Sequence, residues 1–165
     1  MPRMSRVVPE EDLPGALRCV VYDLLILKWS IEDVEKPNEP IYGIPFGREE
    51  VSLVGGLIVC RRLVEFLTRE TPARDTDICI RDFLIEPNPP TIPKTFIGAL
   101  DKFAGHLTLI RAKKSERFPR PTHDDFCCHG CEVLLKGIEF VEEARKTVCL
   151  RGNGLRYYKE LCRTH

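Results

Sequence analysis

Apolar residues recur at alternating spacings of four and three along much of the chain, and proline clusters divide this pattern into segments. Such spacing places the apolar side chains on one face of an α-helix. Between Asp12 and about Glu35 the pattern predicts a first amphipathic helix, with Pro14 in its first turn, where the missing N–H does no harm. The apolar stripe of this helix consists of Leu13, Leu17, Val20, Leu24, Leu27 and Ile31.

A second helix is predicted from about Arg48 to Arg69, after a loop at 36–47 that is rich in proline and glycine. It is apolar on nearly every side, which is typical of a central helix. Gly55 and Gly56 each cost about 1 kcal/mol relative to alanine in a helix interior, so we expect them to permit a close helix approach, the alternative being a kink. Because this helix is more apolar than one bundle interior requires, we also expect a homodimer.

The rest of the chain predicts further helices. A short piece is expected at Thr76 to Leu84, with Asp75 or Thr76 as its cap, and a third long helix at about Pro93 to Lys114. A fourth runs from Pro121 or Thr122 to about Val148, and the tail at 152–165 forms a short helix near Leu155 to Cys162. On the fourth helix the predicted inner face comprises Phe126, Cys127, Cys131, Leu134, Ile138 and Val141.

These segments predict an all-α fold, an antiparallel bundle of four long helices with short extra helices. At 165 residues the chain has the usual size of one domain, with an N-terminal arm at 1–11. No strand alternation and no internal repeat interrupts the helical pattern. We expect one shared core that includes Leu24, Leu57, Leu63, Phe66, Phe103, Leu107 and Leu134.

Composition narrows the functional classes. The chain is 43% hydrophobic, and its 25 basic and 25 acidic residues cancel, so its net charge requires neither a nucleic acid nor a membrane. Residues 1–15 lack the apolar run of a signal peptide, and the apolar stretch at 51–60 is far shorter than the roughly 20 residues of a membrane span. We therefore expect a cytoplasmic protein without a membrane partner.

Eight cysteines are expected to be reduced, and most of them to be small buried hydrophobes without a structural disulfide. The densest cluster contains His123, Cys127 and Cys131, which share a helical face. They span eight residues, roughly 12 Å of helix rise, so one zinc ion can take a single pair from this set and not all three. We therefore predict a cysteine-rich buried face, with no stoichiometric zinc and no cofactor.

A second, quieter cluster lies on the second and third helices. Arg61 and Glu65 are one turn apart on an otherwise apolar helix, so we expect them to pair with each other. His106 lies at the edge of the apolar stripe of the third helix. A single histidine in that position is more often a hydrogen-bonded structural residue than a catalyst.

Three short motifs carry a resemblance to a known group. They are LIVCRRLVEFL at 57–67, DICIRDF at 77–83 and KFAGHLT at 102–108, followed by Arg111. In this order they resemble an uncharacterised group of bacterial helical proteins that is similar to the HEPN superfamily. The resemblance covers about residues 57–141, roughly half of the chain.

The resemblance implies a helical bundle that commonly dimerises and that either cleaves RNA as a toxin or binds RNA or a partner. In a ribonuclease of this kind His106 would be the general acid or base, Lys102 and Arg111 would stabilise the phosphate, and Arg61 would orient the site. The ribonuclease members carry an arginine four to six residues before the histidine, whereas this sequence has Lys102 one turn before it. A lysine lacks the planar fork that clamps a phosphate.

A basic segment follows the third predicted helix. It contains the candidate nucleic-acid-binding residues Lys113, Lys114, Arg117 and Arg120, and its alternative interpretation is a solvated loop. Three functional hypotheses follow. The leading one is a non-catalytic module that binds RNA or a partner protein, the second is a metal-independent endoribonuclease that uses His106, and the third is a structural or regulatory bundle.

Overall fold

The computed structural model describes residues 8–35, 48–69, 78–86, 88–105 and 121–163, with the side chains at 48–50 and 103–105 left out. Within these ranges the chain forms α-helices and one short 3₁₀ helix, η1, and no strand, which confirms the all-α class. The elements are α1 (Leu13–Val34), α2 (Arg48–Thr68), η1 (Ile80–Phe83), α3 (Lys94–Gly105), α5 (His123–Ala144) and α6 (Asn153–Leu161).

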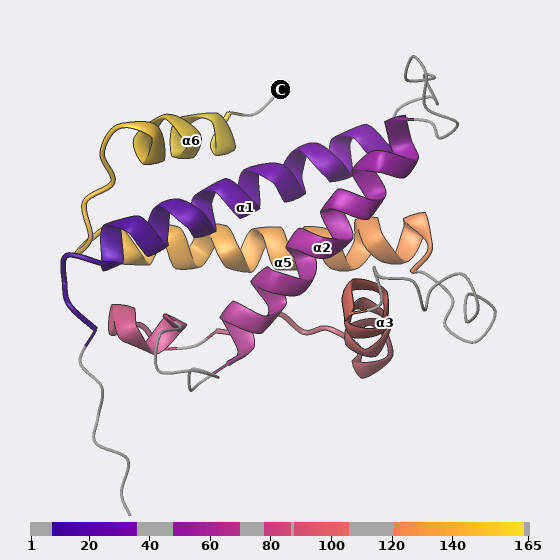
Figure 1. The fold of residues 1–165 in the computed structure, drawn as a ribbon, viewed down its shortest axis with the longest axis horizontal. Helices are drawn as coiled ribbons and strands as arrows, with labels where there is room; N and C mark the ends of the chain where they lie inside the picture. Colours follow the sequence, from indigo (N-terminus) through magenta and orange to yellow (C-terminus); the bar gives the residue numbers. More distant parts are fainter. Residues whose placement is uncertain (1–7, 36–47, 70–77, 87, 106–120, 164–165) are drawn as a thin grey trace, which may run out of the picture.

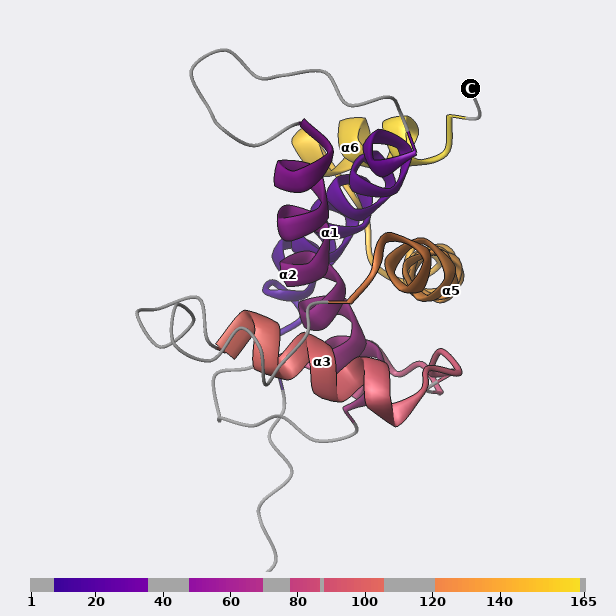
Figure 2. The same cartoon turned by 90° about the vertical axis from the view of Figure 1, so that its right-hand side faces the viewer.

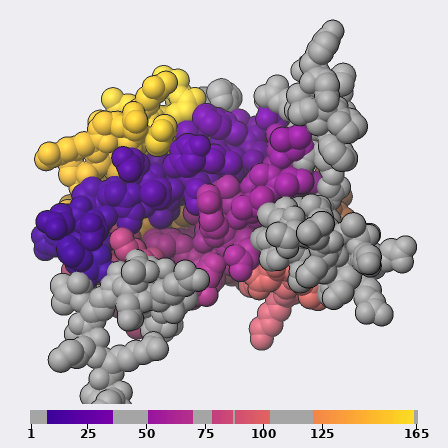
Figure 3. All heavy atoms as spheres, viewed as in Figure 1, coloured from indigo at the N-terminus to yellow at the C-terminus, as the bar shows by residue number. Residues whose placement is uncertain are grey.

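Three long helices meet at the centre of the molecule. Figure 1 shows α1 and α5 running in opposite directions, with α2 crossing both of them diagonally. Figure 2 shows α3 crossing the C-terminal half of α2, and the space-filling view shows α6 lying directly against α1 (Figure 3). Within the described residues α3 has 12 residues and lies across α2, so the arrangement does not by itself establish a bundle of four long antiparallel helices.

The helix starts follow the local sequence. Pro14 stands in the first turn of α1, as predicted. Thr122 caps α5: its hydroxyl accepts a hydrogen bond from the Asp125 N–H at 3.1 Å, and the Asp125 carboxylate accepts one from the Thr122 N–H at 3.3 Å. The predicted piece at 76–84 contains η1, whose first turn is stabilised by the Asp82 carboxylate, which accepts from the Cys79 N–H at 2.8 Å.

Two glycines allow the central helices to touch. A Cβ atom at Gly56 would lie 2.7 Å from the Ser30 Cβ on α1 and would overlap the Phe126 ring on α5. Gly137 on α5 is covered in the same way by Leu24 of α1. The predicted close approach at Gly56 is thus confirmed, whereas no atom approaches Gly55 in this way.

The glycines also correct the predicted inner face of the fourth helix. The buried positions of α5 are Phe126, Gly130, Val133, Gly137, Phe140, Val141 and Ala144. Cys127, Leu134 and Ile138 lie half-buried at the edge of this face, and Cys131 is exposed. The prediction for Cys131 was wrong because a hydrophobic pattern assigns no weight to glycine, although α1 packs directly over Gly130 and Gly137.

The described helices enclose one hydrophobic core. It includes the fully buried Leu24, Leu57 and Leu63, with Phe66 and Leu134 packed against it, as predicted. Phe66 and Phe83 make edge contacts with Phe140, with ring centroids 5.1 and 5.2 Å away, so that η1 is joined to α2 and α5. Two further predicted core members, the Phe103 side chain and Leu107, lie outside the described part of the chain.

Most of the apolar residues around α2 are buried against other helices of the same chain. This helix contacts α1, α3 and α5, and its buried residues include Leu53, Leu57 and Leu67. Val51 is its exposed large apolar residue among those described. The described part of α2 therefore does not present the broad exposed apolar surface from which the homodimer was inferred. The homodimer stays a prediction.

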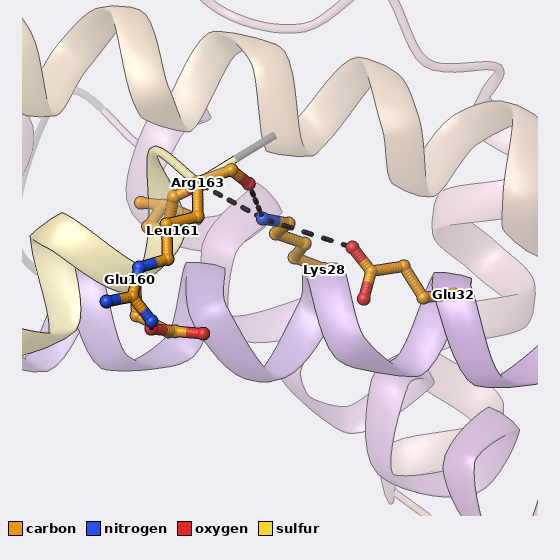
Figure 4. A network of polar contacts seen from close by, with 5 residues as sticks. All are labelled: Lys28, Glu32, Glu160, Leu161 and Arg163. Atoms are coloured by element: carbon orange, nitrogen blue, oxygen red, sulfur yellow. Dashed lines mark hydrogen bonds and ion pairs between the residues drawn. The ribbon is translucent and has the colours of Figure 1, made fainter. Parts of the chain in front are cut away.

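The C-terminal helix is fastened to α1 at its end. The Lys28 ammonium on α1 donates hydrogen bonds to the carbonyl oxygens of Leu161 at 3.3 Å and Arg163 at 2.5 Å, and it lies 3.9 Å from the Glu32 carboxylate (Figure 4). The last carbonyl groups of a helix have no partner within the helix, so a lysine placed there stabilises its end. Of the described helices, none is sufficiently long and apolar to cross a membrane.

Candidate functional site

A cleft of about 430 Å³ lies between the C-terminal half of α2 and the middle of α3. It contains Arg61, one of the predicted site residues. Val64, Ile97 and Leu100 provide its apolar surface, and both Val64 and Leu100 are buried. The polar lining residues are Arg61, Glu65, Thr68, Arg69 and Asp101.

Four of these residues form a continuous chain of ion pairs. The Arg61 Nε donates to the Asp101 Oδ1 on α3 at 3.0 Å, and the Arg61 Nη1 lies 3.7 Å from the Glu65 Oε2. Glu65 also receives the Arg69 Nη2 at 2.5 Å through its other carboxylate oxygen. The pair of Arg61 with Glu65 was predicted from the sequence, and the structure extends it across to α3.

These charges cancel within the cleft. Two guanidinium groups face two carboxylates, and each side chain is more than one-third exposed to solvent. Exposed ion pairs of this kind contribute between about 0 and 1 kcal/mol each, because water screens them. The network therefore fixes the orientation of the side chains more than it stabilises the fold, and the described residues that line the cleft carry no net charge.

The other predicted catalytic residues are not brought into the cleft by the described residues. Lys102 is exposed on α3 directly after Asp101, and it does not line the cavity. His106 follows Gly105 directly in the chain and lies outside the described residues, as do Arg111 and the predicted nucleic-acid-binding residues Lys113, Lys114, Arg117 and Arg120.

Sequence reasoning missed two members of the network. Arg69 lies one turn after Glu65, a spacing that already predicts an ion pair on a helix. Asp101 gave no such signal, because it is 40 positions away from Arg61 and only the crossing of α3 over α2 brings the two together. Contacts between distant positions depend on helix packing, which local periodicity does not specify.

The cysteine cluster near the start of α5 is dispersed around the helix. Cys127 is half-buried, while Cys128 and Cys131 are exposed. The His129 ring packs against Phe96 of α3, with ring centroids 4.7 Å apart. No three histidine, cysteine, aspartate or glutamate side chains in the described ranges are grouped so that they could hold a metal ion.

Exposure also corrects the general prediction for the cysteines. All eight are free thiols, but only Cys60 and Cys79 are buried, and five of the eight are exposed. Desolvation by the surrounding protein atoms raises the pKa of Cys127 and, although its side chain is exposed, of Cys131, and the negative charge of Glu35 raises both further. A raised pKa lowers the fraction of thiolate at neutral pH and so disfavours both thiols as nucleophiles.

Comparison with known proteins found no family model that matches the chain, and no curated protein and no solved structure that matches it.

Proposed function

We propose that this chain is a non-catalytic, HEPN-like helical binding module, built as an antiparallel bundle, that holds a segment of a partner protein in the cleft between α2 and α3. The observation that carries this proposal is the composition of the cleft. Buried apolar side chains and a chain of paired charges of both signs line the same cleft. An apolar centre with a polar rim is the usual anatomy of a protein interface.

The charge balance favours a peptide over RNA in this cleft. RNA binding draws its affinity from unopposed lysine and arginine that displace counterions from phosphates. Here Arg61 and Arg69 contact Glu65 and Asp101, so a phosphate would have to displace or approach carboxylates. A peptide with an apolar side chain and charges of both signs can exchange partners with the same four groups without leaving a charge unpaired.

Peptide display tests the proposal directly. A library of random peptides is selected on the wild-type protein and then counter-selected on Thr68→Trp, because Thr68 is an exposed residue of the cleft wall and an indole there fills the cavity. The matched control is Glu142→Trp, an exposed position on α5 that does not line the cleft. We expect peptides that bind the wild type and the control and lose at least about tenfold in affinity on Thr68→Trp, a difference of about 1.4 kcal/mol.

Two outcomes would contradict this function. Peptides that bind all three proteins equally would place the binding surface elsewhere. Binding of single-stranded RNA that weakens steeply with salt and is lost on Arg61→Gln would identify the cleft as a nucleic-acid site. Fluorescence anisotropy of labelled RNA at two salt concentrations provides that second measurement.

The endoribonuclease remains the second candidate, because one contact favours it. The bond from Arg61 to Asp101 holds the guanidinium group against α3, five positions before His106 in the chain. In this hypothesis His106 is the general acid or base, Lys102 and Arg111 stabilise the phosphate, and Arg61 orients the site.

Replacing His106 by asparagine separates catalysis from architecture. A catalytic histidine predicts that RNA cleavage disappears while the melting temperature hardly moves, whereas a structural one predicts a loss of about 1 to 3 kcal/mol through an unsatisfied partner. Under the proposed binding function we expect no cleavage of single-stranded RNA by the wild type in EDTA. Robust cleavage that His106→Asn abolishes would establish the enzyme in place of the binding module.

A further inference from the structure

A second cavity, of about 400 Å³, lies where the first turns of α1 meet the segment that leads into α6. Figure 1 shows the start of α1 and the start of α6 at the same end of the molecule. The cavity shares no residue with the cleft between α2 and α3 and is independent of the function proposed for that cleft. Its lining consists of Pro14, Gly15, Arg18, Cys149, Leu150 and Arg151.

Two guanidinium groups with no acidic partner among the described residues border this cavity. Arg18 comes from α1, and Arg151 comes from the turn before α6, so that positions 133 apart in the chain supply one positive site. The arginines at 61, 62, 69 and 163, in contrast, each contact a carboxylate. The acidic residues at 10–12 precede α1 in the chain and do not line the cavity.

Close packing holds the two arginine-bearing elements together. A Cβ atom at Gly154 would lie 3.3 Å from the Arg18 Cγ and 3.1 Å from the Leu150 Cδ2, so the absence of a side chain at Gly154 lets α6 rest against the stem of Arg18. The Tyr22 and Tyr157 rings, 5.3 Å apart, and the contacts of Lys28 in Figure 4 fix the rest of α6 on α1. The two backbone segments that carry Arg18 and Arg151 are therefore held side by side, while both arginine side chains are exposed and accessible to a ligand.

We propose that this cavity binds a small phosphate monoester, with the phosphate held by Arg18 and Arg151. Guanidinium groups present planar forks of N–H donors that match phosphate oxygens. None of the described residues that line the cavity is acidic, so no carboxylate of this lining opposes the two guanidinium charges. The cavity exceeds the size of a phosphate group alone, and Pro14 and Leu150 provide an apolar wall for a small organic group.

The exposed thiol of Cys149 provides a reporter inside the cavity. A bound phosphate monoester should shield this thiol from iodoacetamide, and peptide mass spectrometry reads the alkylation of each cysteine separately. Cys162 is exposed and does not line the cavity, so it serves as the internal control. With phenyl phosphate at about ten times its Kd, we expect Cys149 to react about tenfold more slowly and Cys162 to react at an unchanged rate.

Matched variants and probes make the test specific. Arg18→Gln and Arg151→Gln should each abolish the protection, Arg18→Lys should keep part of it, and Arg163→Gln, at an exposed position outside the cavity, should keep all of it. Inorganic phosphate should protect Cys149 more weakly than phenyl phosphate, because it has no organic group to contact the apolar wall. Circular dichroism of each variant checks that the helices are intact.

Three outcomes would overturn the site. Unchanged alkylation of Cys149 at saturating phenyl phosphate would show that the cavity does not bind it. Equal protection by benzoate would identify a general anion site, and equal protection by sodium chloride of the same ionic strength would indicate charge screening alone. Protection of Cys149 that survives in both the Arg18→Gln and the Arg151→Gln variant would show that neither arginine holds the phosphate.

Discussion

Adjacent glycines on α2 permit a sharp test of the packing at the centre of the molecule. Gly55 and Gly56 are consecutive residues in the interior of the same helix, so their helical backbones are alike. A Cβ atom at Gly55 meets nothing within 4 Å, whereas one at Gly56 meets the Ser30 Cβ at 2.7 Å and a Phe126 ring atom at 3.0 Å, besides a closer overlap with the same ring. Alanine at the two positions should therefore change stability in opposite directions.

The magnitudes follow from two opposing effects. Alanine in place of glycine in a helix interior stabilises by about 1 kcal/mol. At Gly55 this effect acts alone, so we expect a gain of about 0.5 to 1 kcal/mol. At Gly56 the added methyl group overpacks a site enclosed by the Ser30 Cβ and the fully buried Phe126 ring, and such overpacking costs about 1 to 3 kcal/mol. Subtracting the gain from alanine leaves an expected net loss of up to about 2 kcal/mol for Gly56→Ala.

Urea denaturation followed by circular dichroism measures both changes on the same scale. For a chain of this size, 1 kcal/mol corresponds to about 2 to 4 °C in melting temperature, so thermal melts should separate the two variants by several degrees. Fluorescence of Trp29, the single tryptophan, gives an independent probe from α1. Equal stabilisation by both substitutions would refute the close contact of α2 with α1 and α5.

Three further predictions concern individual side chains. Burial raises the pKa of Cys60 to about 12 from 9.0, so the unfolded chain loses the thiol proton at a lower pH than the folded chain does. The stability that depends on this proton is fully present below pH 9. Above pH 9 the free energy of unfolding should fall by about 1.4 kcal/mol per pH unit. Urea titrations at pH 8 to 10 should show a flatter decline for Cys60→Ala, and identical slopes would contradict the burial. Leu84 is 95% exposed with a φ of 58°, so Leu84→Asn should stabilise by about 1 kcal/mol in a thermal melt, and a loss would reveal a contact of the leucine. Burial raises the pKa of Asp23 while the charge of Arg62 opposes the shift, so Arg62→Gln should cost about 1 kcal/mol at pH 7, a small value because Arg62 is half exposed. Adding Asp23→Asn should recover part of that loss, and strictly additive losses in the double-mutant cycle would exclude the coupling.

Local features of the sequence determined the helices of this protein. The four-three periodicity placed α1 and α5, the proline and glycine residues marked where helices end, and Thr122 with Asp125 set the start of α5. These features are local because each helix satisfies its own backbone hydrogen bonds and shows its apolar face in the order of its residues. The pair of Arg61 with Glu65 was predictable for the same reason.

Only the tertiary structure decided what depends on how the helices cross. The buried face of α5 rotated toward Gly130 and Gly137 and left Cys131 exposed, because side chains of α1 fill the space above the two glycines. The crossing of α3 over α2 placed Asp101 beside Arg61, and the docking of α6 on α1 placed Arg18 and Arg151 around one cavity. The periodicity of the sequence predicts which residues of a helix face inward. Which residues they then contact depends on how the surfaces of the packed helices fit together, and this fit involves the whole chain.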